Sequence, residues 1–313
     1  MRFFNRSKKS GAWLALVPQR DGVLAATVAR QRDAKPAVTM AAFFAGTPGV
    51  DVLERAGRET GSGAYRCITV LANGDYQLLT AEAPGVAREE LKAAMRWKLK
   101  DILDFPIDDA TFDVFDMPPD PNGAGRSQHN VFAVAARNNV VRARQELFHA
   151  AKVGLAVIDI PDMAQRNVAA LLEPEGRGVA LLAFGEDGGL LTVSWRGELY
   201  LSRRIDVTLA QLREPDAERR LGAFDRIALE LQRSLDNFER QFSFISVAKL
   251  VLAPGIGRDL YDYLSSNLYT RVHMLDLGDV LDLEAVPELL EPAMQQRFFV
   301  PLGAALRQLE DAA

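Results

Sequence analysis

Two segments of the chain, one in each half, repeat the same succession of apolar and turn-forming residues. Residues 13–29 form two apolar runs separated by a polar turn that ends in Asp21-Gly22. Residues 178–195 again form two apolar runs, here separated by the glycine-rich turn 185–189. An apolar run, an Asp/Gly turn and a second apolar run are typical of a β-hairpin. The repetition therefore predicts an α/β protein with a duplicated sheet.

A smaller unit is predicted between these two hairpins. Residues 81–160 read as helix, strand, loop, strand, helix and strand, which indicates an inserted α+β subdomain. Just before it, apolar residues on both sides of Asn73-Gly74 predict a further hairpin, because both turn residues tolerate positive φ. The second half continues with a long amphipathic helix at residues 221–242 and a strand at 247–252. A last helix is predicted at residues 297–309.

Composition excludes several classes of protein. The 313 residues include 37 Lys and Arg and 42 Asp and Glu, a net charge of −5. This balance argues against a protein that coats nucleic acid, since phosphate binding needs a dense basic face. No run approaches the roughly 20 apolar residues that cross a bilayer. Residues 1–10 are predicted to be a basic tail and not a signal peptide.

Few residues suggest catalysis or metal binding. Cys67 is the only cysteine, so no intramolecular disulfide can form, and we expect it to be a small buried residue on a strand. His129, His149 and His273 are scattered and lack a neighbouring Ser/Asp pattern. The nearest acidic group lacks the spacing of a calcium loop, so no metal site is predicted. That group consists of Asp101, Asp104, Asp108 and Asp109.

Two glycine-rich turns are the best candidates for holding a phosphate. The turn at residues 185–189 can present backbone N–H groups to an anion, although an ordinary hairpin loop explains it equally well. Gly255-Ile256-Gly257 lacks the third glycine of a dinucleotide-binding fingerprint. The candidate nucleotide contacts are Gly185, Gly188, Gly255 and Gly257.

Three features together resemble a known family. The first is residues 96–106, Arg-Trp-Lys-Leu-Lys-Asp-Ile-Leu-Asp-Phe-Pro, with the strand 110–116 behind them. The second is residues 230–238, Glu-Leu-Gln-Arg-Ser-Leu-Asp-Asn-Phe. The third is the order of elements. On these features the chain resembles the actin-like ATPase superfamily and, within it, the PilM/MshI-like proteins of type IV pilus (MSHA) biogenesis.

The resemblance implies duplicated actin-like (RNase H-like) sheets around a nucleotide cleft, with a small α+β subdomain inserted in the first. It divides the chain into a basic tail, the start of the first half, the insertion, a return to the first half, the second half, and a C-terminal helix packed on the first half. The corresponding residues are 1–10, 11–80, 81–160, 161–175, 176–290 and 291–313.

The sequence departs from this family in the two phosphate hairpins. Actin-like ATPases carry an Asp-x-Gly in each, and those carboxylates organise Mg²⁺ and the attacking water. Residues 14–19 contain neither Asp nor Gly and have Pro18, while Ala183 stands where the second Asp is expected. A magnesium ion without carboxylate ligands is held poorly. We therefore expect no ATP turnover, no catalytic residues and no cofactor. Nucleotide binding is expected to be weak or lost, so ATP with Mg²⁺ is a disfavoured alternative.

The resemblance also implies a binding function. Its members dock beneath the inner membrane and bind the N-terminal cytoplasmic peptide of a bitopic PilN-like protein near the insertion. Trp97 and Leu99 are the candidate partner-binding residues, with core packing as the alternative for Trp97. The expected location is cytoplasmic and peripheral at the inner membrane, reached only through the partner, and the oligomeric state is left open.

Two other functions remain under consideration from the sequence. The first is an active actin-like ATPase or phosphotransferase, such as a filament-forming ATPase or a sugar kinase. The second is a scaffold related to the cytoplasmic domain of type II secretion platform proteins. The missing acidic residues argue against the first.

Overall fold

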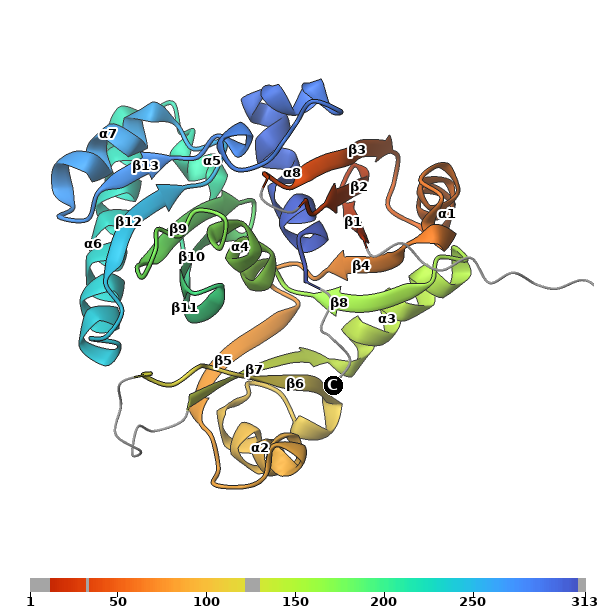
Figure 1. The fold of residues 1–313 in the computed structure, drawn as a ribbon, viewed down its shortest axis with the longest axis horizontal. Helices are drawn as coiled ribbons and strands as arrows, with labels where there is room; N and C mark the ends of the chain where they lie inside the picture. Colours follow the sequence, from red (N-terminus) through yellow and green to blue (C-terminus); the bar gives the residue numbers. More distant parts are fainter. Residues whose placement is uncertain (1–11, 32–33, 122–129, 309–313) are drawn as a thin grey trace, which may run out of the picture.

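The computed structural model describes residues 12–31, 34–121 and 130–308 (Figure 1). The predicted basic tail and His129 lie outside these residues. Within them, no helix is both long enough and apolar enough to span a bilayer.

The first half of the chain forms a five-stranded mixed sheet with the order β3-β2-β1-β4-β8. The β1–β2 pair is the predicted hairpin, and Gln19 pairs with Gly22 across a two-residue turn. β1, β4 and β8 are parallel neighbours. The strands are β1 (Trp13–Gln19), β2 (Gly22–Ala29), β3 (Ala37–Ala45), β4 (Arg66–Val70) and β8 (Leu155–Asp159).

The second half forms a sheet of the same design, with the order β11-β10-β9-β12-β13. In both sheets three consecutive antiparallel strands are followed by two parallel ones. The predicted duplication is therefore confirmed. The strands are β9 (Gly178–Gly185), β10 (Gly188–Trp195), β11 (Glu198–Ile205), β12 (Val247–Leu252) and β13 (Val272–Met274).

Helices pack on both faces of the two large sheets and form hydrophobic cores with them. α4 (Pro161–Ala169) and α8 (Pro292–Ala305) lie between the sheets and share one hydrophobic core with both. α1 (Val50–Glu59) and α3 (Asn138–Ala150) cover the other face of the first sheet. The other face of the second sheet is covered by α5 (Leu209–Leu212), α6 (Ala217–Gln241) and α7 (Arg258–Asn267).

The insertion is a three-stranded sheet, β5-β7-β6, with one helix on its outer face. Figure 1 shows it below the two large sheets. Its elements are β5 (Tyr76–Glu82), α2 (Arg88–Ile102), β6 (Ala110–Asp116) and β7 (Asn130–Arg137).

Two predictions at the edges of the insertion are wrong. β4 and β5 do not form a hairpin around Asn73-Gly74, because β4 pairs with β1 and β8 while β5 pairs with β7. The Asn-Gly turn redirects the chain from one sheet to another. β8, predicted to close the insertion, instead completes the first sheet.

Other predictions are refined by the structure. Cys67 is a buried free thiol on β4, as expected. α8 begins five residues earlier than predicted, at Pro292, and contains Pro301 in its interior. It packs against β1, β2 and β4 of the first half, and against α4. Short 3-10 turns at Leu277–Asp279 and Pro287–Leu290 lead into it.

Candidate functional site

The turns of the two duplicated hairpins meet each other. Arg20 lies in the β1–β2 turn, and its Nη1 is 2.9 Å from Oε2 of Glu186 in the β9–β10 turn. In an actin-like ATPase these two turns would face the phosphates. Here an ion pair between side chains of the two halves joins them.

The acidic residue of the first turn already has a partner. Nη2 of Arg297, in the first turns of α8, donates to Oδ2 of Asp21 at 2.5 Å. The guanidinium also lies over the ring of Phe43, 3.6 Å from its centroid. Asp21 is therefore held by an arginine. Within the described residues, no three His, Cys, Asp or Glu side chains group closely enough to hold a metal ion.

The positions expected to carry the phosphate-site carboxylates lie on the strands and not in the turns. Pro18 pairs with Val23, and Ala183 pairs with Leu190. Gly185 and Gly188 flank the second turn and pair with each other. Gly188 has φ +122°, a backbone conformation that favours glycine. Hairpin geometry accounts for that glycine without a ligand.

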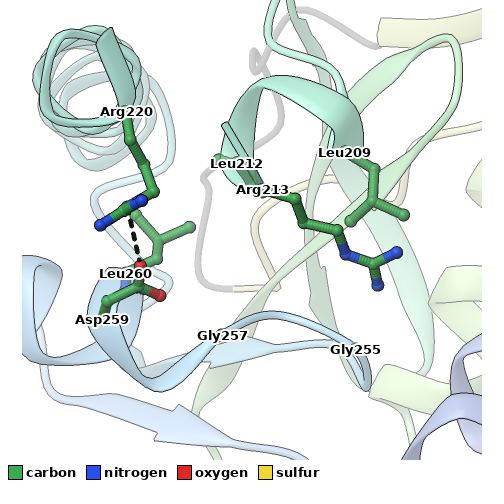
Figure 2. Close-up of a pocket in the computed structure, with 8 residues that line it drawn as sticks. All are labelled: Leu209, Leu212, Arg213, Arg220, Gly255, Gly257, Asp259 and Leu260. Atoms are coloured by element: carbon green, nitrogen blue, oxygen red, sulfur yellow. Dashed lines mark hydrogen bonds and ion pairs between the residues drawn. The ribbon is translucent and has the colours of Figure 1, made fainter. Parts of the chain in front are cut away.

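The second glycine cluster borders a small cavity of about 240 Å³ (Figure 2). Ligand pockets usually begin at roughly 300 Å³, so this one is small for a nucleotide. Nε of Arg220 is 3.2 Å from Oδ2 of Asp259 at one side of it. The cavity is lined by Leu209, Leu212, Arg213, Arg220, Gly255, Gly257, Asp259 and Leu260.

The side chain of Gln296 fills the space next to this glycine loop. Gly255 has φ +88°, and a Cβ there would overlap the Gln296 side chain. Nη2 of Arg213 donates to Oε1 of Gln296 at 3.0 Å. Gln296 and Arg297 therefore place the start of α8 between the glycine loop and the first hairpin turn. Sequence reasoning missed both residues; the polar run before the apolar part of α8 was the available signal.

A larger concave region lies on the first half, along α3 and β8. It has a volume of about 550 Å³ and follows β8, the outer strand of its sheet. Its lining combines apolar side chains with residues of this edge strand. The residues are Gln145, Phe148, His149, Val153, Gly154, Leu155, Ala156, Val157 and Ile158, and we call this region the β8 groove.

The predicted partner-binding residues do not line the β8 groove. Trp97 is 75% exposed on α2, which excludes core packing for it. Leu99 is fully buried in the core of the insertion with Leu91 and Met95, so it cannot contact a partner directly. α2 covers one face of the small sheet, whereas Ile158 and Ile160 pack on the other side.

Buried charges lie where β8 ends. Asp159 is buried, and Nη1 of Arg307 donates to its Oδ2 at 3.3 Å. Burial raises the pKa of the Asp159 carboxyl, and the charge of Arg307 only partly offsets that effect. Arg166, from α4, is also close enough to act on this carboxyl. The groove strand is thus tied electrostatically to α4 and to the end of the chain.

A second buried cluster joins the insertion to the second half. The hydroxyl of Tyr76 donates to Oδ2 of Asp162, and Ser202 donates to Oδ1 at 2.5 Å. Arg204 lies over the Tyr76 ring, 4.7 Å from its centroid. Burial, followed by the Asp162 charge, raises the pKa of Tyr76 far above its usual range, so this phenol is a permanent donor.

Known proteins share part of this sequence and its overall fold. The family model for type IV pilus assembly protein PilM matches residues 50–201, a little under half of the chain. A solved PilM-PilN type IV pilus biogenesis complex superimposes with a TM-score of 0.75 at 21% identity, over 97% of this chain and 100% of that one. The chain therefore resembles PilM in sequence over residues 50–201 and shares the fold of that solved structure.

A second solved structure places this PilM-like chain in a wider fold. A Bacteroides thetaiotaomicron protein with an actin-like ATPase fold and unknown function matches with a TM-score of 0.50 and 10% identity, over 92% of this chain and 98% of that one. The predicted actin-like fold class is therefore confirmed. Among curated proteins, none matches the sequence.

Proposed function

We propose that this PilM-like chain is a cytoplasmic adaptor of a type IV pilus assembly platform, of the MSHA type. Its partner is the N-terminal cytoplasmic peptide of a PilN-like inner-membrane protein, which holds the adaptor at the membrane periphery. The observation that carries the proposal is the family match, together with the agreement in fold with the PilM of a PilM-PilN complex over nearly the whole chain.

The β8 groove is the surface that suits an extended peptide. Among the residues that the structure describes, β8 is an outer strand, and one edge of its backbone has no neighbouring strand. An added strand gains main-chain hydrogen bonds along such an edge. The half-buried apolar side chains of Leu155, Val157 and Ile158 along the groove would contact side chains of the peptide.

The nucleotide cleft, by this proposal, no longer performs phosphoryl transfer. Of the three acidic residues in the two turns, Asp21 and Glu186 are each paired with an arginine, and Asp187 is exposed. A bound triphosphate would meet these ion pairs instead of free carboxylates. Gln296 occupies the space beside Gly255.

Fluorescence anisotropy tests the adaptor function. The probe is the labelled N-terminal cytoplasmic peptide of the PilN-like protein from the same organism, titrated with the full chain. We expect saturable binding that Ala156→Glu weakens about tenfold or more, because it places a carboxylate in the middle of the groove. Tyr269→Ala, at a fully exposed side chain on the second half, is the matched control and should bind like the wild type.

Two outcomes would change the proposal. Absence of binding to the wild-type chain would overturn the adaptor function. Loss of binding in Trp97→Ala, with Ala156→Glu unaffected, would move the site from the β8 groove to α2. Circular dichroism of each variant separates a lost contact from a lost fold.

The alternative is an active actin-like ATPase or phosphotransferase. The retained fold and the cavity beside Gly255 and Gly257 favour it. It requires magnesium-dependent ATP hydrolysis or phosphoryl transfer by the purified chain, which the adaptor proposal does not.

A further inference from the structure

The outer face of α6 carries opposite charges on two parallel flanks. α6 is 25 residues long and runs down the left edge of the molecule in Figure 1. Four exposed arginines recur at intervals of seven residues, and a second exposed row follows the same interval one residue earlier. The first row is Arg219, Arg226, Arg233 and Arg240; the second is Glu218, Asp225, Gln232 and Glu239.

A ridge separates the two rows. Seven residues make nearly two turns of an α-helix, so each row stays close to one side of the helix. Gly222, Leu229 and Asp236 run between the rows. Leu229 lies at the centre of this ridge and is 45% exposed. The ridge is therefore small and apolar in its N-terminal part, with charges of opposite sign to either side.

Several of these charges are available to another molecule. Within the described residues, the guanidinium groups of Arg219 and Arg226 have no hydrogen-bond or ion-pair partner, although the backbone N–H of Arg219 donates to the Asp216 side chain. Asp225 accepts the hydroxyl of Tyr263 through Oδ1, which fixes the carboxylate at the surface. Arg233, in contrast, is paired with Glu230 on the same helix at 3.5 Å. The N-terminal half of α6 thus has the most unsatisfied charge.

The arrangement of the two rows selects one kind of symmetric contact. If two copies of α6 pack in parallel about a two-fold axis along the helices, the arginine row of each copy faces the acidic row of the other. Arg226 then lies level with Asp225 of the other copy, and Arg219 with Glu218. If the helices pack antiparallel, like rows face each other and repel.

We propose that the chain self-associates through α6, as a parallel two-fold dimer centred on Gly222 and Leu229. The partner that fits this surface is a second copy, because each copy supplies both the positive and the negative row in matching register. The contact does not depend on the pilus function proposed above. It leaves the β8 groove free, since that groove lies on the first half.

Sedimentation equilibrium of the full chain over a range of concentrations tests the proposal. We expect a monomer–dimer equilibrium whose dissociation constant rises about tenfold or more in Arg226→Glu and in Asp225→Arg, because each change creates two like-charge contacts. Arg58→Glu reverses an exposed charge on α1 and is the matched control, which should dimerise like the wild type.

Mixing the two α6 variants tests the direction of packing. An equimolar mixture of Arg226→Glu and Asp225→Arg restores opposite charges at both contacts of a parallel heterodimer, so dimerisation should return to the wild-type level. A wild-type chain that stays monomeric, a dimer indifferent to both substitutions, or a mixture that fails to recover would each overturn the proposal.

Discussion

Asp162 brings together side chains from three separate segments, and its two oxygens have different partners. Replacing it with Ala leaves the hydroxyls of Tyr76 and Ser202 buried without an acceptor. We expect Asp162→Ala to lower the free energy of unfolding by about 3 kcal/mol. Asp162→Asn should lose only about 1 kcal/mol, because its amide still accepts one bond and can donate another. Urea denaturation measures both, and equal losses would contradict this role.

Asp159 makes stability depend on pH in a direction opposite to most carboxylates. Its pKa is raised in the folded chain, so the folded state binds a proton more tightly than the unfolded state. The stability that this proton linkage provides is complete below the ordinary carboxyl pKa of about 4 and is lost as pH rises through the folded pKa.

Asp159→Asn removes that titration. The stability of the variant relative to the wild type should therefore increase as pH rises from about 4 towards neutrality. Urea denaturation at a series of pH values measures the difference. Parallel stability curves for the two proteins would show that the carboxyl has no such linkage.

Single residues could be predicted from the sequence only when their environment is local. Cys67 was correctly expected inside a strand because its neighbours are apolar. The sequence shows that Asp21 and Glu186 are acidic residues in turns, but it does not predict their arginine partners. Arg297 is 276 positions from Asp21, and such a contact depends on how the two halves fold together.

At the scale of elements, α4 and α8 cross closely enough to exclude a side chain. A Cβ at Gly303 would overlap the backbone carbonyl of Ala164, and Nδ2 of Asn167 donates to the Gly303 carbonyl at 2.9 Å. We expect Gly303→Ala to destabilise the fold by about 3 kcal/mol, since backbone atoms must move. Gly222→Ala, in open space on α6, should stabilise by about 0.5 kcal/mol. Thermal unfolding of dilute protein measures both, and a tolerated Gly303→Ala would show that the helices can separate.

Elements with strong periodicity were predicted well, and their pairing less well. Both duplicated hairpins lie where apolar runs and turn residues predict them, and α6 covers nearly all of the helix predicted at residues 221–242. The Asn73-Gly74 hairpin failed because turn chemistry specifies a change of direction and not which strand becomes the neighbour. Sequence order places β8 in the insertion. In the chain three strands, β5, β6 and β7, separate β8 from β4, yet β4 is its parallel neighbour in the sheet.

For the whole molecule, the two halves share one strand order and meet at their hairpin turns. The sequence predicted this duplication from repeated patterns alone. It did not predict the contacts of Arg20, Gln296 and Arg297, because these side chains bind residues that lie far away in the sequence. Those contacts support our proposal that the two turns bind each other in place of a nucleotide.

Calorimetric titration of the purified full chain with ATP and Mg²⁺ tests this account most directly. We predict no saturable heat up to millimolar nucleotide, because the expected Asp-x-Gly carboxylates are missing, Asp21 and Glu186 are paired with arginines, and Gln296 lies beside Gly255. Tight, magnesium-dependent binding with one nucleotide per chain would contradict it.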